Sequence, residues 1–284
     1  MTGTAAPSSA LRCGSRWLDL SRPLLMGIVN VTPDSFSDGG LHADAAAAIA
    51  HARALVAAGA DLLDIGGEST RPGAQPVSLD EELQRVIPVI EALAGEGVPL
   101  SIDTYKPGVM RAAIAAGAVM VNDVFALRQP GALEAAAGTD AAVCLMHMQG
   151  TPQTMQADPH YDDVVGEVAA FLRERIAACE AAGIARERIV VDPGFGFGKT
   201  TAHNIALLRG LRRIVEASGR PLLAGLSRKS VLGRITARDK ASERVAASVA
   251  SALVAVQNGA RILRVHDVAE TLDMVRVWQA LEAA

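Results

Sequence analysis

Aromatic residues and cysteines are scarce in this sequence, and each scarcity excludes a class of protein. Aromatic side chains make up 3% of the 284 residues, which argues against a protein that stacks nucleic-acid bases on its rings. The three cysteines, Cys13, Cys144 and Cys179, are widely spaced and form no CxxC pair, so we expect free thiols rather than disulfides or a zinc site. The net charge is −4 without a basic tract, which disfavours nucleic acid and anionic membranes as partners.

Long apolar runs are also missing, and no window approaches the roughly 18 uninterrupted apolar residues of a membrane span. The opening MTGTAAPSSALRCGSR has no apolar signal-peptide core. We therefore expect a flexible tail over residues 1–20 and a cytoplasmic protein. Half of the residues are apolar, enough for a sizeable core in a single domain over residues 21–284.

Short apolar strands alternate with helical segments through the chain. The predicted strands are 24–29, 61–65, 98–102, 118–121, 141–146, 188–191, 221–226 and 261–265, and the predicted helices are 42–58, 79–95, 109–116, 132–137, 162–182, 201–218, 242–258 and one after Asp267. Ser78 with Glu81, and Asp267 with Glu270, have the spacing of helix N-caps. Eight strand–helix units favour a closed (β/α)₈ barrel, with an open doubly wound sheet as the alternative.

Polar side chains gather where the predicted strands end, and they include Asn30, Arg71, Asp103, Asn122, His147, Asp192, Lys229, Arg264 and His266. In a barrel all eight of these ends meet at one face, which holds the site. Singly, each residue has an ordinary explanation, since Asp103 or Asp192 could cap the next helix. Their coincidence on one rim favours a binding site.

The charges on this rim predict the kind of ligand. Arg71, Lys229, Arg264 and His266 supply positive charge, and the loops after strands seven and eight of a barrel commonly bind phosphate. Arginine offers a bidentate fork to phosphate oxygens and lysine a mobile point charge. Asp103, Asn122 and Asp192 carry groups that hydrogen-bond the edges of a flat heterocycle. We therefore expect an anionic ligand, with phosphate beside a planar ring.

Two familiar motifs fail on inspection. The segment GFGFGKT at residues 194–200 resembles a P-loop, but the glycine that the P-loop requires at position 193 is Pro193. The same segment fails the dinucleotide-binding pattern because position 199 is lysine. The chain contains no HExxH zinc motif and no GxSxG nucleophile elbow, so a protein-held zinc and a serine hydrolase are both disfavoured.

Eight segments, spread in order from about residue 24 to residue 272, resemble the signatures of the bacterial dihydropteroate synthase family. They are MGIVNVTPDSFSDGG, DIGGESTRPGA, SIDTYKP, VNDV, LMHMQGTP, DPGFGFGK, LSRKS and RVHDV. The resemblance implies a (β/α)₈ barrel, a homodimer and a Mg²⁺ requirement. It also implies the condensation of 4-aminobenzoate with 6-hydroxymethyl-7,8-dihydropterin diphosphate, which releases diphosphate.

The resemblance also implies a role for each matching residue, with Asp103, Lys229, Arg264 and His266 as the catalytic set. The pterin would contact Asp103, Asn122, Met146, Asp192 and Lys229; the diphosphate Asn30, Arg71, Arg264 and His266, with Asn30 also on Mg²⁺; and aminobenzoate Thr70, Arg71, Pro72, Phe197 and Ser227. Loops 32–39 and 71–75 would close as lids. Sulfonamides would imitate aminobenzoate.

Two alternatives remain open at this point. One is a pterin-binding barrel that transfers a folate methyl group, and the other is a paralogue that binds pterin without catalysis. The NVTPDSFSDGG loop and the SRK turn favour the synthase, because methyl transfer leaves no diphosphate to hold. The motif positions show no departure that indicates a degenerate site.

Overall fold

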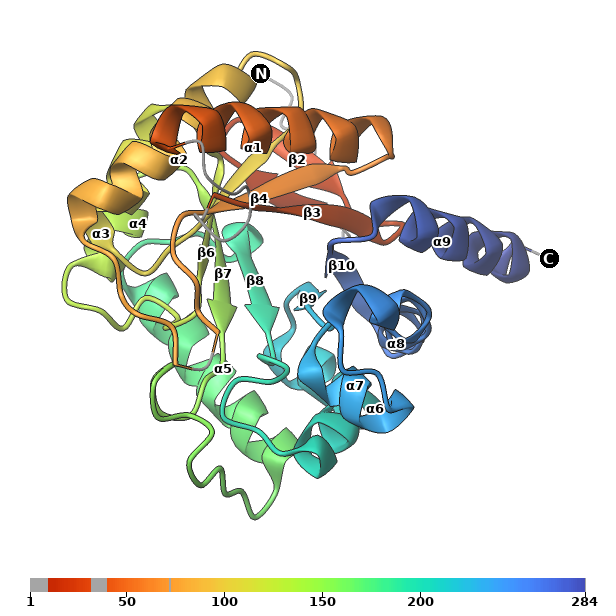
Figure 1. Ribbon diagram of the computed structural model, residues 1–284. Helices are drawn as coiled ribbons and strands as arrows, with labels where there is room; N and C mark the ends of the chain where they lie inside the picture. Colours follow the sequence, from red (N-terminus) through yellow and green to blue (C-terminus); the bar gives the residue numbers. More distant parts are fainter. Residues whose placement is uncertain (1–9, 32–39, 72, 284) are drawn as a thin grey trace.

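Eight parallel strands close into a barrel (Figure 1). The computed structural model describes residues 10–31, 40–71 and 73–283. The barrel strands are β3 (Leu24–Asn30), β4 (Leu62–Gly66), β5 (Leu100–Asp103), β6 (Met120–Asp123), β7 (Ala142–Met146), β8 (Ile189–Asp192), β9 (Leu222–Ala224) and β10 (Ala260–Val265). They pair in this order, and β10 closes the ring against β3. The predicted single-domain (β/α)₈ barrel is confirmed.

Helices cover the outside of the barrel (Figure 1). They are α1 (Gly40–Ala57), α2 (Leu79–Leu93), α3 (Pro107–Ala115), α4 (Ala132–Ala137), α5 (Val164–Ala181), α6 (Thr201–Ser218), α7 (Ser230–Thr236), α8 (Val245–Gln257) and α9 (Val268–Glu282), with short 3₁₀ turns η2 (Arg186–Arg188) and η3 (Ala241–Arg244). Among these described helices, none is both long enough and apolar enough to cross a membrane. Apart from α7 and the two 3₁₀ turns, which were not predicted, the predicted ends of the helices lie within three residues of the observed ones.

The predicted helix caps are only partly correct. Ser78 Oγ accepts a hydrogen bond of 3.1 Å from Glu81 N, as expected, but the Glu81 carboxylate pairs with Arg85 instead of returning to the cap. Asp267 occupies the N-cap position of α9 without a side-chain cap bond. Its carboxylate binds the Arg228 guanidinium, because a charged partner offers a stronger hydrogen bond than a backbone amide.

The flexible tail predicted for residues 1–20 is wrong over its described part. Strands β1 (Ala10–Cys13) and β2 (Arg16–Asp19) form an antiparallel hairpin. Leu11, Cys13 and Leu20 of this segment are fully buried. They share an apolar cluster with the strand starts and barrel interior, which includes Leu24, Met26, Leu62, Met120, Ala142, Cys144, Val190, Leu223 and Ile262. The hairpin therefore closes the end of the barrel opposite the strands' carboxyl ends.

Candidate active site

Four strands bring a hydrogen-bonded polar cluster to the carboxyl end of the barrel. Arg264 of β10 donates from Nε to Asp64 Oδ2 on β4 at 2.6 Å. Its Nη2 donates to Asp103 Oδ2 on β5 at 2.7 Å, and Asn122 Nδ2 on β6 donates to Asp64 Oδ2 at 2.9 Å. We call Asp64, Asp103, Asn122 and Arg264 the Asp64 cluster.

The Asp64 cluster has an excess of hydrogen-bond acceptors. Asp64 Oδ1 is buried and has no hydrogen-bond partner among the described residues. Burial raises the pKa of Asp103, and the nearby Arg264 opposes that rise. Burial also opposes the charge of Arg264, but Asp64 and Asp103 outweigh it and raise the pKa of the guanidinium. A buried free carboxylate oxygen is costly unless a donor reaches it, so the cluster suits a ligand that carries N–H groups.

Asp192 and Lys229 lie beside this cluster. Asp192 Oδ1 accepts a hydrogen bond of 2.7 Å from Gly194 N, so its carboxylate holds a turn and does not cap a helix. Lys229 Nζ donates to the Phe195 carbonyl. Burial lowers the pKa of Lys229 to about 8, against the opposing effect of Asp192. A Cβ added at Gly225 would lie 3.9 Å from Arg264 Cβ and 4.0 Å from Asp192 Oδ2, so Asp192 and the Asp64 cluster flank the same space.

The buried side chain of Lys199 fixes the loop after β8. Lys199 is 2% exposed, and its Nζ donates to the carbonyl oxygens of Gly194 and Phe197, each at 2.9 Å. It also lies 3.0 Å from His147 Nδ1. Burial, followed by the Lys199 charge, lowers the pKa of His147 to about 2, so the ring is neutral and can accept this bond. The loop therefore holds Phe197, whose ring centroid lies 4.4 Å from Lys229 Nζ.

His266 differs from the sequence-based expectation in its charge, whereas the predicted role of Arg71 stays a prediction. His266 Nδ1 lies 3.0 Å from Ser227 Oγ. Burial, together with Arg264, lowers the pKa of His266 to about 4, so the imidazole is neutral at pH 7 and the positive charge expected from it is absent. The Arg71 side chain is exposed and makes no hydrogen bond within the described part of the chain.

The other predicted site residues that the structure describes lie at or just after the carboxyl ends of the strands. Asn30 ends β3 and is half-buried, with Gly66 as its partner across the strands. Met146 is buried in an apolar cluster on which Phe197 packs. Thr70 is half-buried in the loop after β4. Pro72 and loop 32–39 lie outside the described residues.

Asp64 and Lys199 are the site residues that the sequence analysis did not identify. The expected site residues lie at strand ends, whereas Asp64 lies within the apolar strand LLDIG. A carboxylate inside a strand buried on both faces requires a polar partner, and that signal was available in the sequence. For Lys199 the tested P-loop pattern failed, and no pattern in the sequence indicates that its ammonium turns inward onto its own loop.

Comparisons with known proteins identify the family of this chain. A family model described as "Pterin binding enzyme" matches residues 26–266. The dihydropteroate synthase of Neisseria meningitidis serogroup B is 55% identical over 269 residues, which are 93% of this chain and 94% of the relative.

Two solved structures of Xanthomonas albilineans dihydropteroate synthase are also similar. One, with 4-aminobenzoic acid, has a TM-score of 0.92 at 59% identity and covers 98% of this chain and 100% of its own. The other, in complex with 7,8-dihydropteroate, has a TM-score of 0.87 at 54% identity and covers 97% of this chain and 99% of its own. By sequence and fold, the chain belongs to the dihydropteroate synthase family of pterin-binding enzymes.

Proposed function

We propose that this chain condenses 4-aminobenzoate with 6-hydroxymethyl-7,8-dihydropterin diphosphate to give 7,8-dihydropteroate and diphosphate. The observation that carries the proposal is the Asp64 cluster, which lies with Asp192 and Lys229 around one opening. Its free carboxylate oxygen and its amide match the donor and acceptor edges of a pterin. The family relationship supplies the reaction.

The pterin ring binds in the space bounded by the Asp64 cluster, Asp192 and Lys229. Asp64 Oδ1 gains the donor that it lacks, which makes ring binding favourable because an unsatisfied buried acceptor is relieved. Asn122 and Asp192 contact the ring edge, and Met146 contributes apolar surface. Lys229 donates to a ring acceptor in place of the Phe195 carbonyl.

The reaction exchanges one bond to the methylene carbon for another. The C–O bond to the diphosphate breaks and its electron pair leaves with the oxygen; the aminobenzoate nitrogen then forms the new C–N bond and loses a proton to solvent or diphosphate. Positive charge that develops on the pterin methylene is stabilised by the nearby Asp103 carboxylate. Arg264, Arg71 and His266 hold the diphosphate, with His266 as a neutral hydrogen-bonding group.

Mg²⁺ fits this site through the diphosphate. The described residues contain no group of three or more His, Cys, Asp or Glu side chains able to hold a metal. Mg²⁺ often takes one or two protein oxygens, with substrate phosphates and water as its other ligands, and the Asn30 amide oxygen at the end of β3 meets that need. The ion, when bound, would neutralise the leaving diphosphate.

Aminobenzoate binds toward the outer part of the opening. Phe197 offers a ring face held beneath Lys229, and Ser227 offers a hydroxyl that also contacts His266. Thr70 and Arg71 lie on this side in the loop after β4, and the family resemblance adds Pro72 and closure by loops 32–39 and 71–75, which would exclude water. Sulfonamides occupy the same place and inhibit competitively with aminobenzoate.

We extend the proposal to assembly and location. The protein is a cytoplasmic homodimer. Support for the dimer comes from apolar side chains that α8 and α9 leave exposed, Val254, Val277 and Leu281; sedimentation at twice the chain mass tests it. The three cysteines are buried free thiols, which suits a reducing compartment.

One assay tests the function. The protein is incubated with Mg²⁺, dihydropterin diphosphate and 4-aminobenzoate, and the release of diphosphate is followed. Release that depends on aminobenzoate is the expected result. A chain that binds the pterin but releases no diphosphate would be a non-catalytic paralogue, and transfer of a methyl group from a methylfolate would identify the methyltransferase alternative.

A further inference from the structure

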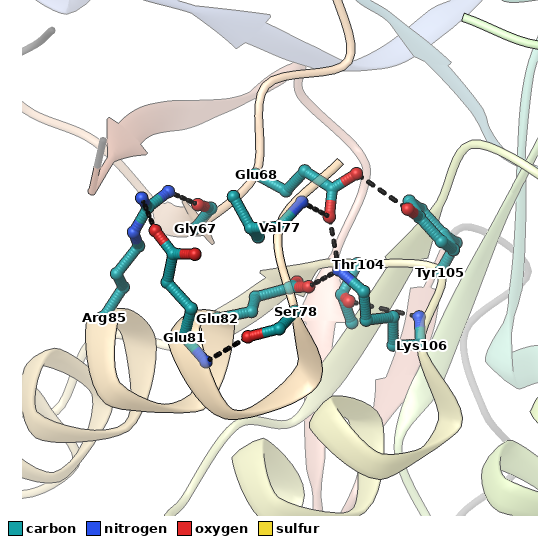
Figure 2. A network of polar contacts seen from close by, with 10 residues as sticks. All are labelled: Gly67, Glu68, Val77, Ser78, Glu81, Glu82, Arg85, Thr104, Tyr105 and Lys106. Carbon is teal, nitrogen blue, oxygen red and sulfur yellow. Dashed lines mark hydrogen bonds and ion pairs between the residues drawn. The ribbon is translucent and has the colours of Figure 1, made fainter. Parts of the chain in front are cut away.

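A second polar network, half-buried apart from the fully buried Glu82, lies outside the Asp64 cluster and joins the loops after β4 and β5 (Figure 2). It contains Glu68, which follows β4, Glu82 of α2, and the consecutive residues Tyr105 and Lys106, which precede α3. Lys106 Nζ bonds both carboxylates, Glu68 and Glu82. We call these four residues the Glu68 clasp.

Glu68 closes the loop that follows β4 into a ring. Its Oε2 accepts a hydrogen bond of 3.4 Å from Val77 N, nine residues later, and its Oε1 accepts one of 2.7 Å from the Tyr105 hydroxyl (Figure 2). Both ends of the segment 68–77 are therefore held by one carboxylate. Thr70 and Arg71, which the proposed function places on the aminobenzoate and diphosphate, lie inside this ring.

Lys106 ties that ring to two further elements. It is the N-cap residue of α3 and follows Asp103 of the Asp64 cluster by three positions. Its second partner, Glu82, is 1% exposed, and a buried carboxylate requires a cation or several donors. The clasp therefore links the loop after β4, helix α2 and the loop after β5 through one ammonium.

The base of the ring is also fixed against α2. Arg85 Nη1 donates to the Gly67 carbonyl at 2.7 Å (Figure 2). A Cβ added at Gly67 would lie 2.8 Å from Val86 Cγ1 and 3.1 Å from Glu82 Cγ, so glycine permits this close approach. The backbone that leads into Glu68 has little freedom to shift.

The tip of the same loop makes two local hydrogen bonds of its own. Arg71 N reaches Ser69 Oγ at 3.4 Å, and Ala74 N reaches the Arg71 carbonyl at 3.1 Å. The side chains of Ser69 and Arg71 are exposed. The contacts of the clasp lie at the base of the loop, on either side of Thr70 and Arg71.

We propose that Glu68, Glu82 and Lys106 are positioning residues that set Thr70 and Arg71 for the arylamine substrate, while the pterin subsite is built without them. This inference rests on the proposed function. It predicts a selective effect, because loss of the clasp moves the outer subsite and leaves the Asp64 cluster intact. The KM for aminobenzoate rises, whereas affinity for the pterin is retained.

The test uses Glu68→Gln in the full-length protein. This change keeps the shape of the side chain and leaves Lys106 paired with Glu82, so the fold is retained. We expect the KM for aminobenzoate to rise by at least about tenfold. We expect the Kd of a pterin lacking diphosphate, measured by calorimetry, to stay within about twofold. The Val77 amide should also exchange hydrogen faster, because a neutral carboxamide has only one oxygen and is a weaker acceptor than the carboxylate.

Glu96→Gln is the matched control. Glu96 pairs with Arg53 on the outside of the protein, and the same substitution there should change none of the three measurements. A double variant, Glu82→Gln with Lys106→Met, removes the clasp from the other side and should reproduce the selective rise in KM.

Several results would overturn the clasp: an unchanged KM for aminobenzoate in Glu68→Gln, a parallel loss of pterin affinity, or an equal effect of Glu96→Gln. Failure of the proposed function is a separate result. It would appear as a native protein without synthase activity. In that case, hydrogen exchange at the Val77 amide and the Kd of the pterin would still show whether the clasp holds the loop independently of the pterin subsite.

Discussion

Lys229 provides a test of the site through pH. Its folded pKa of about 8 lies below the ordinary lysine value because the side chain is buried, so its charge is present below this pH and lost above it. We expect kcat/KM for the pterin diphosphate to decrease above about pH 8, since this ratio reports ionisations of the free enzyme. In Lys229→Arg, the decrease should move upward by at least about one pH unit, because arginine stays charged.

Substrate ionisation is the same for both proteins, so comparison of the two profiles isolates the side chain. A decrease at one common pH in both would assign the titration to another group and remove Lys229 from this role.

Asp64 allows a second test at the residue scale, because the same strand region offers a matched carboxylate. Asp64→Asn removes one of the two charges that hold Arg264. We expect kcat/KM for the pterin diphosphate to fall at least about tenfold, or about 1.4 kcal/mol in the barrier. Asp61, just before β4, pairs with Arg22 away from the mouth. Asp61→Asn should therefore spare kcat/KM; equal losses in both variants would mean that Asp64 acts through stability alone.

At the scale of the element, the loop after β8 depends on glycine. Gly194 has φ +68°, and a Cβ there would lie 1.9 Å from the His147 carbonyl oxygen. We expect Gly194→Ala to lower the free energy of unfolding by at least about 3 kcal/mol through backbone strain and overlap. Gly183 has φ +90° with no atom within 4 Å of an added Cβ, so Gly183→Ala isolates the backbone cost of about 1 kcal/mol. Urea unfolding measures both, and similar losses would show that the overlap relaxes.

The elements that sequence patterns predicted are those with a regular local signal. Helix α6 was predicted at both ends, because an amphipathic run stands between Thr200 and Gly219. Helix α7 was missed, because it has seven residues with Gly233 in its interior, where glycine weakens helix propensity. Gly233 is there for a tertiary reason, since an added Cβ would lie 2.5 Å from the Arg238 carbonyl oxygen.

For the site, the sequence predicted which residues lie at the strand ends, but not their pairing or their charge states. Asp103, Asn122, Asp192 and Arg264 follow from the rule that strand ends meet at one face. The pairing of Arg264 with Asp64 does not follow, because residues two hundred positions apart are joined only by closure of the barrel. The neutral state of His266 depends on burial by the whole fold, which local sequence does not express.

At the scale of the whole molecule, the β1–β2 hairpin contributes to stability. Leu11 is fully buried in the apolar cluster that the hairpin shares with the strand starts. Leu11→Ala should therefore lower the free energy of unfolding by about 2–5 kcal/mol. Ile235 on α7 is 56% exposed, and Ile235→Ala should change this free energy by less than about 0.5 kcal/mol. Denaturant unfolding measures both variants. Equal stability of the two would mean that the barrel closes without the hairpin.

That hairpin has a consequence for how substrates reach the site. Because side chains fill the amino end of the barrel, substrates and products must enter and leave the site at the carboxyl end of the strands. Under the proposed roles, the pterin occupies the deeper subsite and aminobenzoate the subsite nearer the solvent. The pterin diphosphate must then bind before aminobenzoate, because an arylamine bound first would block access to the pterin subsite.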